Sequence, residues 1–295
     1  MSCKQPHVLS IQSHVVSGYV GNKSATFPLQ LLGFDVDTIN SVQLSNHTGY
    51  KVFKGQVLND QDLTQLVDGL AENELDNYSH LLTGYVGSAS FLNRIAQLVK
   101  ALKIKNPNLV YVCDPVLGDN GHMYVPEELK NIYKNDILPL ADIITPNQFE
   151  LELLTGLTIK TMSELKEAIK VLHSKGPKIV AVSSTDIENK LTSVTSVSKD
   201  NTMIKIEVPR IPAIYTGSGD LFAALLLAHT YLEDDIKISL EKTINTLFEV
   251  LEKTYHHSLT IKEANAQQAK KIELRLIQSK KNIENPNILL RAVNF

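Results

Sequence analysis

The segment 215–222 carries the clearest chemical pattern in this sequence. Gly217 and Gly219 flank Ser218, Asp220 follows at once, and an apolar run of good helix formers comes next. A glycine-rich turn that leads into a helix leaves backbone N–H groups free, and these groups form an anion site together with the helix dipole. A carboxylate beside such a site should repel the anion, so the position of Asp220 needs a reason.

Two interpretations of Asp220 are open at this point. Asp220 could cap the helix, as acidic residues often do near a helix N-terminus. Alternatively, the amides of residues 217–220 would stabilise charge on a transferred phosphoryl group, and Asp220 would accept a proton from the attacking hydroxyl. Because short glycine-rich loops are common, this segment alone does not decide between the two.

The composition is that of an ordinary globular protein. The chain has 295 residues, 43% hydrophobic and 21% charged, which suffices for one large α/β domain or two small ones. The formal net charge of −3 gives no reason to expect a nucleic-acid or membrane-surface partner. No apolar run reaches the length of a membrane span, and the first residues lack the apolar core of a signal peptide. Cys3 and Cys113 are the only cysteines, which excludes a disulfide framework and predicts a reducing, cytoplasmic location.

The order of the predicted elements indicates the fold. Strands are expected at residues 8–11, 34–42, 80–83, 109–113, 141–144 and 178–182. Helices are expected at residues 22–32, 60–75, 91–102 and 163–173. This alternation predicts an α/β fold with a central, mostly parallel sheet covered by helices on both faces. Because no repeat, low-complexity segment or linker interrupts it, we expect residues 1–295 to form a single domain.

The C-terminal part of the chain follows a different pattern. Residues 192–197 and 203–208 are β-like with no helix between them, which predicts an antiparallel hairpin. Beyond residue 217 the chain is expected to be mostly helical to about residue 283, with a β-prone tail at 288–292.

Polar residues follow the predicted parallel strands. They are Ser13, Gly84, Tyr85, Asp114, Thr145, Asn147, Ser183 and Ser184. In open parallel sheets the ligand lies beyond the carboxyl ends of the strands. We therefore expect these residues to converge on one crevice.

Several motifs together resemble the ribokinase-like superfamily of small-molecule kinases. Residues 217–220 are similar to its Gly-Xaa-Gly-Asp anion hole and base, and residues 145–150 to its Asn-Xaa-Xaa-Glu element. Longer stretches resemble the pyridoxal kinases of this superfamily, at residues 9–15, 18–22, 45–50 and 112–119. The similarity extends through nearly the whole chain and looks closest to the animal enzymes.

This resemblance implies a fold and an activity. The fold would be a ribokinase-like three-layer α/β/α sandwich, assembled as a homodimer. The activity would be ATP-dependent phosphorylation of the 5′-hydroxymethyl group of pyridoxal, and also of pyridoxine and pyridoxamine. Mg²⁺, or Zn²⁺ or another divalent ion in its place, would accompany ATP, and a monovalent cation such as K⁺ or Na⁺ would bind nearby.

The resemblance also implies roles for individual residues. Asp220 would be the general base, and the anion hole would consist of the amides of Gly217, Ser218, Gly219 and Asp220. The vitamer would contact Ser13, Val20, Val42, Thr48, Tyr85 and Asp220. ATP would contact Asp114, Tyr124, Asn147, Ser183, Ser184, Ile211, Pro212, Ala213, Gly217 and Ser218. The metal side would comprise Asp114, Asp119, Thr145 and Glu150.

The sequence departs from the family pattern at two points, and rival functions remain. The lid loop at residues 119–124 is shorter than in the animal enzymes, and Ser218 stands where many relatives have threonine or alanine. A hydroxymethylpyrimidine kinase would share the phosphoryl-transfer residues, although Ser13, Thr48 and Tyr85 favour pyridoxal. A nicotinamide-dependent dehydrogenase would need G-x-G-x-x-G after the first strand, and residues 13–18 do not contain it. A non-catalytic vitamin B6 carrier is disfavoured by the intact base.

Overall fold

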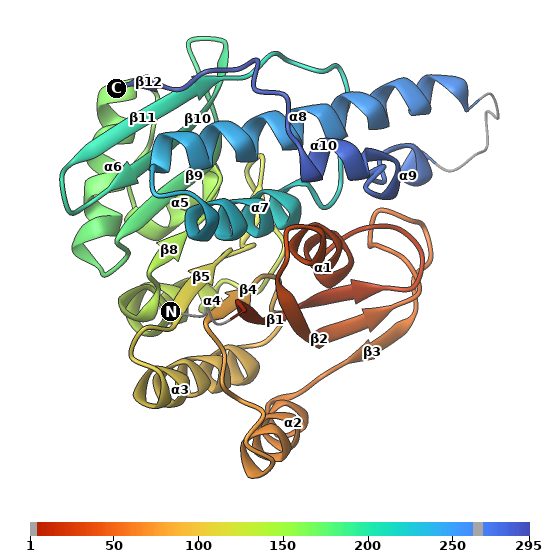
Figure 1. The fold of residues 1–295 in the computed structure, drawn as a ribbon, viewed down its shortest axis with the longest axis vertical. Helices are drawn as coiled ribbons and strands as arrows, with labels where there is room; N and C mark the ends of the chain where they lie inside the picture. Colours follow the sequence, from red (N-terminus) through yellow and green to blue (C-terminus); the bar gives the residue numbers. More distant parts are fainter. Residues whose placement is uncertain (1–4, 262–267) are drawn as a thin grey trace.

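A ten-stranded sheet runs through the computed structural model, which describes residues 5–261 and 268–295, so that Cys3 lies outside the described part. The order of the strands is β12-β11-β10-β9-β8-β5-β4-β1-β2-β3 (Figure 1). The parallel strands are β1 (His7–Val15), β2 (Asp35–Leu44), β4 (His80–Thr83), β5 (Val110–Cys113), β8 (Ile143–Ile144) and β9 (Ile179–Ile187). Antiparallel strands extend both edges, with β3 (Gly55–Val57) on one side and β10 (Lys190–Val197), β11 (Thr202–Glu207) and β12 (Val293–Asn294) on the other.

Helices cover both faces of this sheet (Figure 1). One face carries α1 (Asn22–Leu31), α7 (Ser218–Leu232) and α8 (Ile236–Thr260), and the other carries α2 (Asp60–Glu72), α3 (Ala89–Lys105), α4 (Glu128–Ile132), α5 (Gln148–Thr155) and α6 (Met162–Ser174). Successive strand residues point to opposite faces, so Leu81 of β4 packs toward α2 and α3 while Leu82 packs toward α7. The prediction of a mostly parallel sheet between two helical layers is therefore confirmed.

The remaining helical segments are short. They are α9 (Gln268–Lys271), α10 (Lys280–Glu284) and the single turns Tyr133–Ile137, Leu138–Leu140 and Ile277–Ser279. The predicted helical character of the C-terminal part and the antiparallel hairpin β10–β11 are both confirmed. No described helix is long and apolar enough to cross a membrane.

Three details of the fold were not predicted correctly. No pattern in the sequence predicted β3 or the small hairpin of β6 (Gly118–Asp119) and β7 (His122–Met123). The tail at residues 288–292 is not a strand, because its backbone groups bond to side chains of α8 instead of a neighbouring strand. Asn245 Oδ1 accepts from the N–H groups of Leu289 and Leu290, and Glu241 Oε1 accepts from that of Ala292.

The topology creates a site at the carboxyl ends of the parallel strands. β1 lies between β2 and β4, so the chain moves away from β1 in both directions along the sheet. Such a reversal of strand order leaves a crevice where ligands bind. The strand β9 continues past Ser183 and Ser184, so these residues lie inside the strand and not after it. The register between β9 and β10 shifts beside them and forms a bulge. A bulge changes the direction of side chains, and such irregularities are frequent next to active sites.

The central strand β4 supplies a test of the core. Leu81 is fully buried, and we expect Leu81→Ala to lower the free energy of unfolding by about 2–5 kcal/mol because it leaves a cavity in a packed layer. Urea unfolding followed by circular dichroism measures this difference. The matched control is Leu75→Ala, since Leu75 is 57% exposed and its loss should change stability by less than about 0.5 kcal/mol. Equal effects of the two substitutions would contradict the layer assignment.

Candidate active site

The N-terminus of α7 is built around Gly217. This residue has φ of 80°, a conformation that only glycine adopts without strain, and a Cβ here would lie 2.3 Å from the carbonyl oxygen of Tyr19. The helix bond from Leu221 N–H to Gly217 O follows, so the N–H groups of Ser218, Gly219 and Asp220 precede the hydrogen-bonded part of the helix. These N–H groups are available to an anion.

The carboxylate of Asp220 is held by the N-terminal part of the chain. Its Oδ2 accepts a hydrogen bond of 2.7 Å from the backbone N–H of Gly21, and α7 itself has no side-chain cap. The capping interpretation of Asp220 is therefore wrong. Burial raises the pKa of Asp220, and the Gly21 N–H opposes that rise. One oxygen is thus fixed, and the other can receive a proton.

Two more contacts fix the turn before α7. The Ser24 hydroxyl of α1 donates to Gly217 O at 3.1 Å, and the N–H of Thr216 donates to Ile272 O at 3.2 Å. The turn is thus held from the first helix and from the C-terminal part of the chain. Its geometry is set by tertiary contacts, which makes it a preorganised anion site.

A second carboxylate, Asp114, faces this turn from the end of β5. A Cβ built on Gly219 would lie 3.8 Å from Asp114 Oδ2. Burial and the negative charges of Glu150 and Asp220 raise the pKa of Asp114 well above its usual range. Thr145 opposes this rise, although its buried hydroxyl has no hydrogen-bond partner of normal geometry among the described residues. The site therefore combines mutually repelling acids with an unsatisfied hydroxyl.

Glu150 holds the backbone on the same side of the site. Its Oε1 accepts from the N–H of Leu117 at 2.8 Å and its Oε2 from the N–H of Asn147 at 2.9 Å. Burial raises the pKa of Glu150 to about 7, against the lowering effect of these N–H groups. The bonds span a strained turn, because Val116 has φ of 39°, which a β-branched residue rarely adopts. Glu150 thus positions the segment after Asp114.

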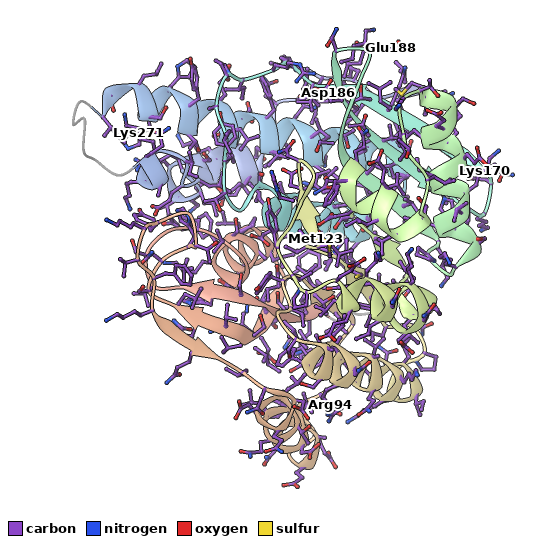
Figure 2. The ribbon with its side chains drawn as sticks, turned by 180° about the vertical axis from the view of Figure 1, so that it is seen from behind. Arg94, Met123, Lys170, Asp186, Glu188 and Lys271 are labelled. Carbon is purple, nitrogen blue, oxygen red and sulfur yellow. The ribbon has the colours of Figure 1, made fainter. Side chains whose placement is uncertain are left out.

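The other predicted nucleotide-side residues surround this turn. Asn147 caps α5 and donates from Nδ2 to Gly118 O at 2.8 Å. Asp119 lies on the β6–β7 hairpin, and Tyr124, which is 57% exposed, follows it. Met123 of this hairpin lies near the middle of the view in Figure 2, well away from Arg94 on α3 and Asp186 at the end of β9.

Two further predicted ATP-side groups lie in different settings. Ser183 is partly exposed, and its N–H donates to Pro146 O at 2.9 Å, so the bulge in β9 lies against the end of β8. Ser184 is exposed. The segment Ile211, Pro212 and Ala213 is at least partly exposed, and Ala213 N–H bonds to Ile211 O at 2.8 Å. No side-chain hydrogen bond joins this segment to Asp114 in the described residues.

The predicted vitamer residues fall into two groups. Ser13 lies against Gly21, which bonds to Asp220, since a Cβ on Gly21 would be 2.4 Å from Ser13 Oγ, and Val20 directly precedes Gly21 in the chain. The second group, on and around β2, consists of Val42, Thr48 and Tyr85. Val42 is buried in β2, Thr48 is exposed after it, and the backbone oxygen of Tyr85 accepts from the Ser41 hydroxyl of β2 at 2.8 Å.

The acids form only a partial metal site. The described residues contain no group of three or more His, Cys, Asp or Glu side chains that could hold a metal ion. Asp114 nevertheless offers a buried carboxylate that forms no salt bridge within the described residues, next to the unsatisfied Thr145 hydroxyl. These oxygens fit Mg²⁺, which usually takes one or two protein carboxylates and completes its shell with water and phosphate. Both Glu150 oxygens already accept backbone N–H groups, so Glu150 fits the role of a direct ligand less well.

Comparisons with known proteins identify the family of this chain. The family model described as phosphomethylpyrimidine kinase matches residues 37–267. A pyridoxal kinase from Arabidopsis thaliana is 49% identical over 294 residues, which covers 98% of this chain and 94% of that protein. The human pyridoxal kinase is 47% identical over 309 residues, with 97% of each chain covered. This chain belongs to the pyridoxal kinase family.

A solved structure extends the likeness to three dimensions. Pyridoxal kinase from Leishmania donovani, in complex with ADP and pyridoxamine, has a TM-score of 0.89 and 34% identity, with 98% of this chain and 99% of that chain covered. The ribokinase-like fold prediction is therefore confirmed. The plant and human relatives are similarly close, so an animal type is not distinguished within the pyridoxal kinase family.

Sequence reasoning missed the residues that hold the site together. Gly21 and Ser24 each bond to the segment around α7, and Glu150 was expected on the metal side although it anchors a strained turn. A weak signal for Gly21 was present in the sequence, since a glycine in the loop after the first strand permits a close approach of the backbone. Nothing in the sequence pairs Gly21 with a residue 199 positions away.

The raised pKa of Glu150 predicts how stability depends on pH. Between its ordinary value of 4.5 and about 7, the folded protein keeps a proton on Glu150 that the unfolded chain loses. Its contribution to the free energy of unfolding should thus fall as pH rises through this window, on the order of 1–3 kcal/mol. Urea unfolding at several pH values measures it, and Glu150→Gln should remove this part of the slope. An unchanged slope in Glu150→Gln would contradict the assignment.

Proposed function

We propose that this chain transfers the γ-phosphoryl group of ATP to the 5′-hydroxymethyl group of pyridoxal, and also of pyridoxine and pyridoxamine. The observation that carries the proposal is the Asp220 carboxylate, fixed on one oxygen by Gly21 and placed in the first turn of α7 beside free N–H groups. Membership of the pyridoxal kinase family supplies the substrate class. The relative from Leishmania donovani holds ADP with pyridoxamine in one structure and with pyridoxine in another.

Asp220 acts as the general base in this proposal. The free carboxylate oxygen accepts the proton of the vitamer hydroxyl as the hydroxyl oxygen forms a bond to the γ-phosphorus. The bond from that phosphorus to the β–γ bridging oxygen breaks, and ADP leaves with the electron pair. The base must be ionised, so its raised pKa sets the acid limit of activity.

The turn before α7 supplies the electrostatic part of catalysis. The N–H groups of Ser218, Gly219 and Asp220 stabilise negative charge on the phosphoryl oxygens in transit. Ser24 and Thr216 keep these donors in place before substrate arrives. Such preorganisation is effective because no donor has to reorient during the reaction.

Asp114 and the Thr145 hydroxyl are the proposed groups for Mg²⁺, with Asp119 nearby and Glu150 holding their backbone. Zn²⁺ or another divalent ion could bind the same oxygens. The ion would supply positive charge that offsets the phosphate charge when bound. A K⁺ or Na⁺ ion close to the phosphates is part of the proposal by family resemblance alone.

The remaining contacts follow the same resemblance. We infer that Ser13, Val20, Val42, Thr48 and Tyr85 surround the vitamer. Tyr124, Asn147, Ser183, Ser184, Ile211, Pro212 and Ala213 would contact the nucleotide. A homodimer and a cytoplasmic location complete the proposal, and the continuous sheet supports one domain over residues 1–295.

A hydroxymethylpyrimidine kinase is the second candidate function. The description of the matching family model favours it, since that model is named for phosphomethylpyrimidine kinases. The two functions predict different products from the same ATP-dependent assay. The measurement is the ratio of kcat/KM for pyridoxal to kcat/KM for hydroxymethylpyrimidine. A ratio below one would favour the hydroxymethylpyrimidine kinase.

The first prediction on activity concerns Asp220. We expect Asp220→Ala and Asp220→Asn to lower kcat for pyridoxal 5′-phosphate formation by about 10²–10⁴, because both remove the proton acceptor. Wild-type kcat/KM should fall on the acid side with an apparent pKa above 3.8. Both variants must still bind pyridoxal and ATP, which equilibrium titration checks. Similar turnover in wild type and variants would remove the base role and leave the kinase assignment intact.

A further prediction concerns Asp114 and separates activity from stability. Asp114→Asn removes one of the repelling acids, so the free energy of unfolding without metal should rise at pH 7. The same change should raise the Mg²⁺ concentration for half-maximal activity, because a ligand is lost. Parallel urea unfolding and Mg²⁺ titrations of activity provide the measurements. A less stable variant with normal Mg²⁺ dependence would contradict both expectations.

A further inference from the structure

Glu273 is a buried carboxylate outside the reacting groups. Only 6% of the residue is exposed, and it lies between α9 and the C-terminal helical turn at Ile277–Ser279. Lys271, labelled in Figure 2, ends α9 two positions earlier. In Figure 1 α9 lies beside the loop that follows β2. This loop, residues 45–54, carries the proposed vitamer residue Thr48.

Both oxygens of Glu273 are engaged. Oε1 accepts a hydrogen bond of 2.7 Å from the Tyr50 hydroxyl, and Oε2 pairs with Lys270 Nζ at 2.7 Å. The carboxylate and burial together raise the pKa of Tyr50, with burial the larger cause, so the hydroxyl stays a donor. A charged acceptor makes this bond stronger than one between neutral groups.

A second side chain ties the same loop to the same segment. His47 is buried, and its Nε2 lies 3.2 Å from the carbonyl oxygen of Ala269. The backbone N–H of Gly49 donates to His47 Nδ1 at 3.2 Å, which leaves Nε2 as the donor toward Ala269. The rings of His47 and Tyr50 lie 4.7 Å apart at 61°. Thr48 therefore sits between two side chains that are anchored to residues 269–273.

Glu273 also contacts the two segments that hold Asp220. Gly18 has φ of 98°, which favours glycine, and a Cβ there would lie 3.0 Å from Glu273 Oε1, so the loop that leads to Gly21 lies close to this carboxylate. Thr216 and Glu273 form a parallel bridge, and Thr216 precedes the turn of α7. One buried carboxylate thus joins the loop of Thr48, the loop of Gly21 and the turn of the anion site.

We propose that Glu273 is a positioning residue of the vitamer site, which sets the distance between the Thr48 loop and the Asp220 turn. The proposal rests on the proposed function, because it assumes that these two segments enclose the vitamer. The residue has no contact with the nucleotide-side acids Asp114 and Glu150 among the described residues. Its loss should therefore weaken vitamer binding more than ATP binding.

The experiment compares Glu273→Gln, Tyr50→Phe and the double variant. Each single change should raise the KM for pyridoxal about tenfold to a hundredfold, as expected for loss of a hydrogen bond to a buried charge, with the KM for ATP changed less than about twofold. The double variant should be no worse than the more affected single variant, because Glu273→Gln removes the charge of the acceptor and Tyr50→Phe removes the donor of one and the same bond.

Two control variants separate positioning from general destabilisation. Lys270→Gln removes the outer ion pair, whose lysine is 52% exposed, and should leave both KM values within about twofold of wild type. Asn245→Ala removes the tie between α8 and the C-terminal tail, so it should lower the thermal midpoint without a selective change in the KM for pyridoxal. If Asn245→Ala also raised the KM for pyridoxal selectively, that result would overturn the proposal.

The remaining outcomes separate failure of the positioning role of Glu273 from failure of the proposed kinase function. Equal increases in both KM values, or additive effects in the double variant, would overturn the positioning role. If wild type binds pyridoxal but does not phosphorylate it, the proposed function fails, and the Kd for pyridoxal then replaces KM in the same comparison. If wild type does not bind pyridoxal at all, both inferences fail.

Discussion

Electrostatic repulsion among Asp114, Glu150 and Asp220 is the constraint on which the rest of the site depends. The end of β5 and the first turns of α5 and α7 bring these acids together, where burial favours their protonated forms and the negative charges of Glu150 and Asp220 add to this effect at Asp114. The fold opposes this with backbone N–H groups, from Gly21 for Asp220 and from Leu117 and its neighbours for Glu150. The charged form of Asp114 receives the least stabilisation from hydrogen-bond donors, so a bound cation would stabilise it more than the other two acids.

The division of labour among the acids follows from how each is held. Asp220 has one oxygen fixed and one available, which suits proton transfer. Glu150 has both oxygens occupied by backbone donors, which suits a residue that fixes the strained segment around Val116. Three acidic side chains of similar chemistry therefore differ in role because of their neighbours and not because of their type.

Local patterns predicted those parts of the fold that depend on local physics. The alternation of apolar runs predicted the parallel strands and the two helical layers, and Gly217 predicted a turn that only glycine forms without strain. The tail at residues 288–292 was predicted wrongly because Asn245 and Glu241 take its backbone groups, and no local pattern records that competition. Ser183 and Ser184 were placed after a strand that in fact continues, since a bulge depends on the partner strand.

The hydrogen bonds that complete the site join residues that lie far apart in the sequence. Gly21 and Asp220 are 199 positions apart, and Tyr50 and Glu273 are 223 apart. A ribosome synthesises the chain from its N-terminus, so most of the parallel strands are available for pairing before α7 and α9 have been made. Contacts across such separations also form late when an intact chain folds, because a long loop must first be closed. Assembly of the active site is therefore one of the last events in the biogenesis of this protein, and a nascent chain can hold a nearly complete sheet while its catalytic carboxylate is still unanchored.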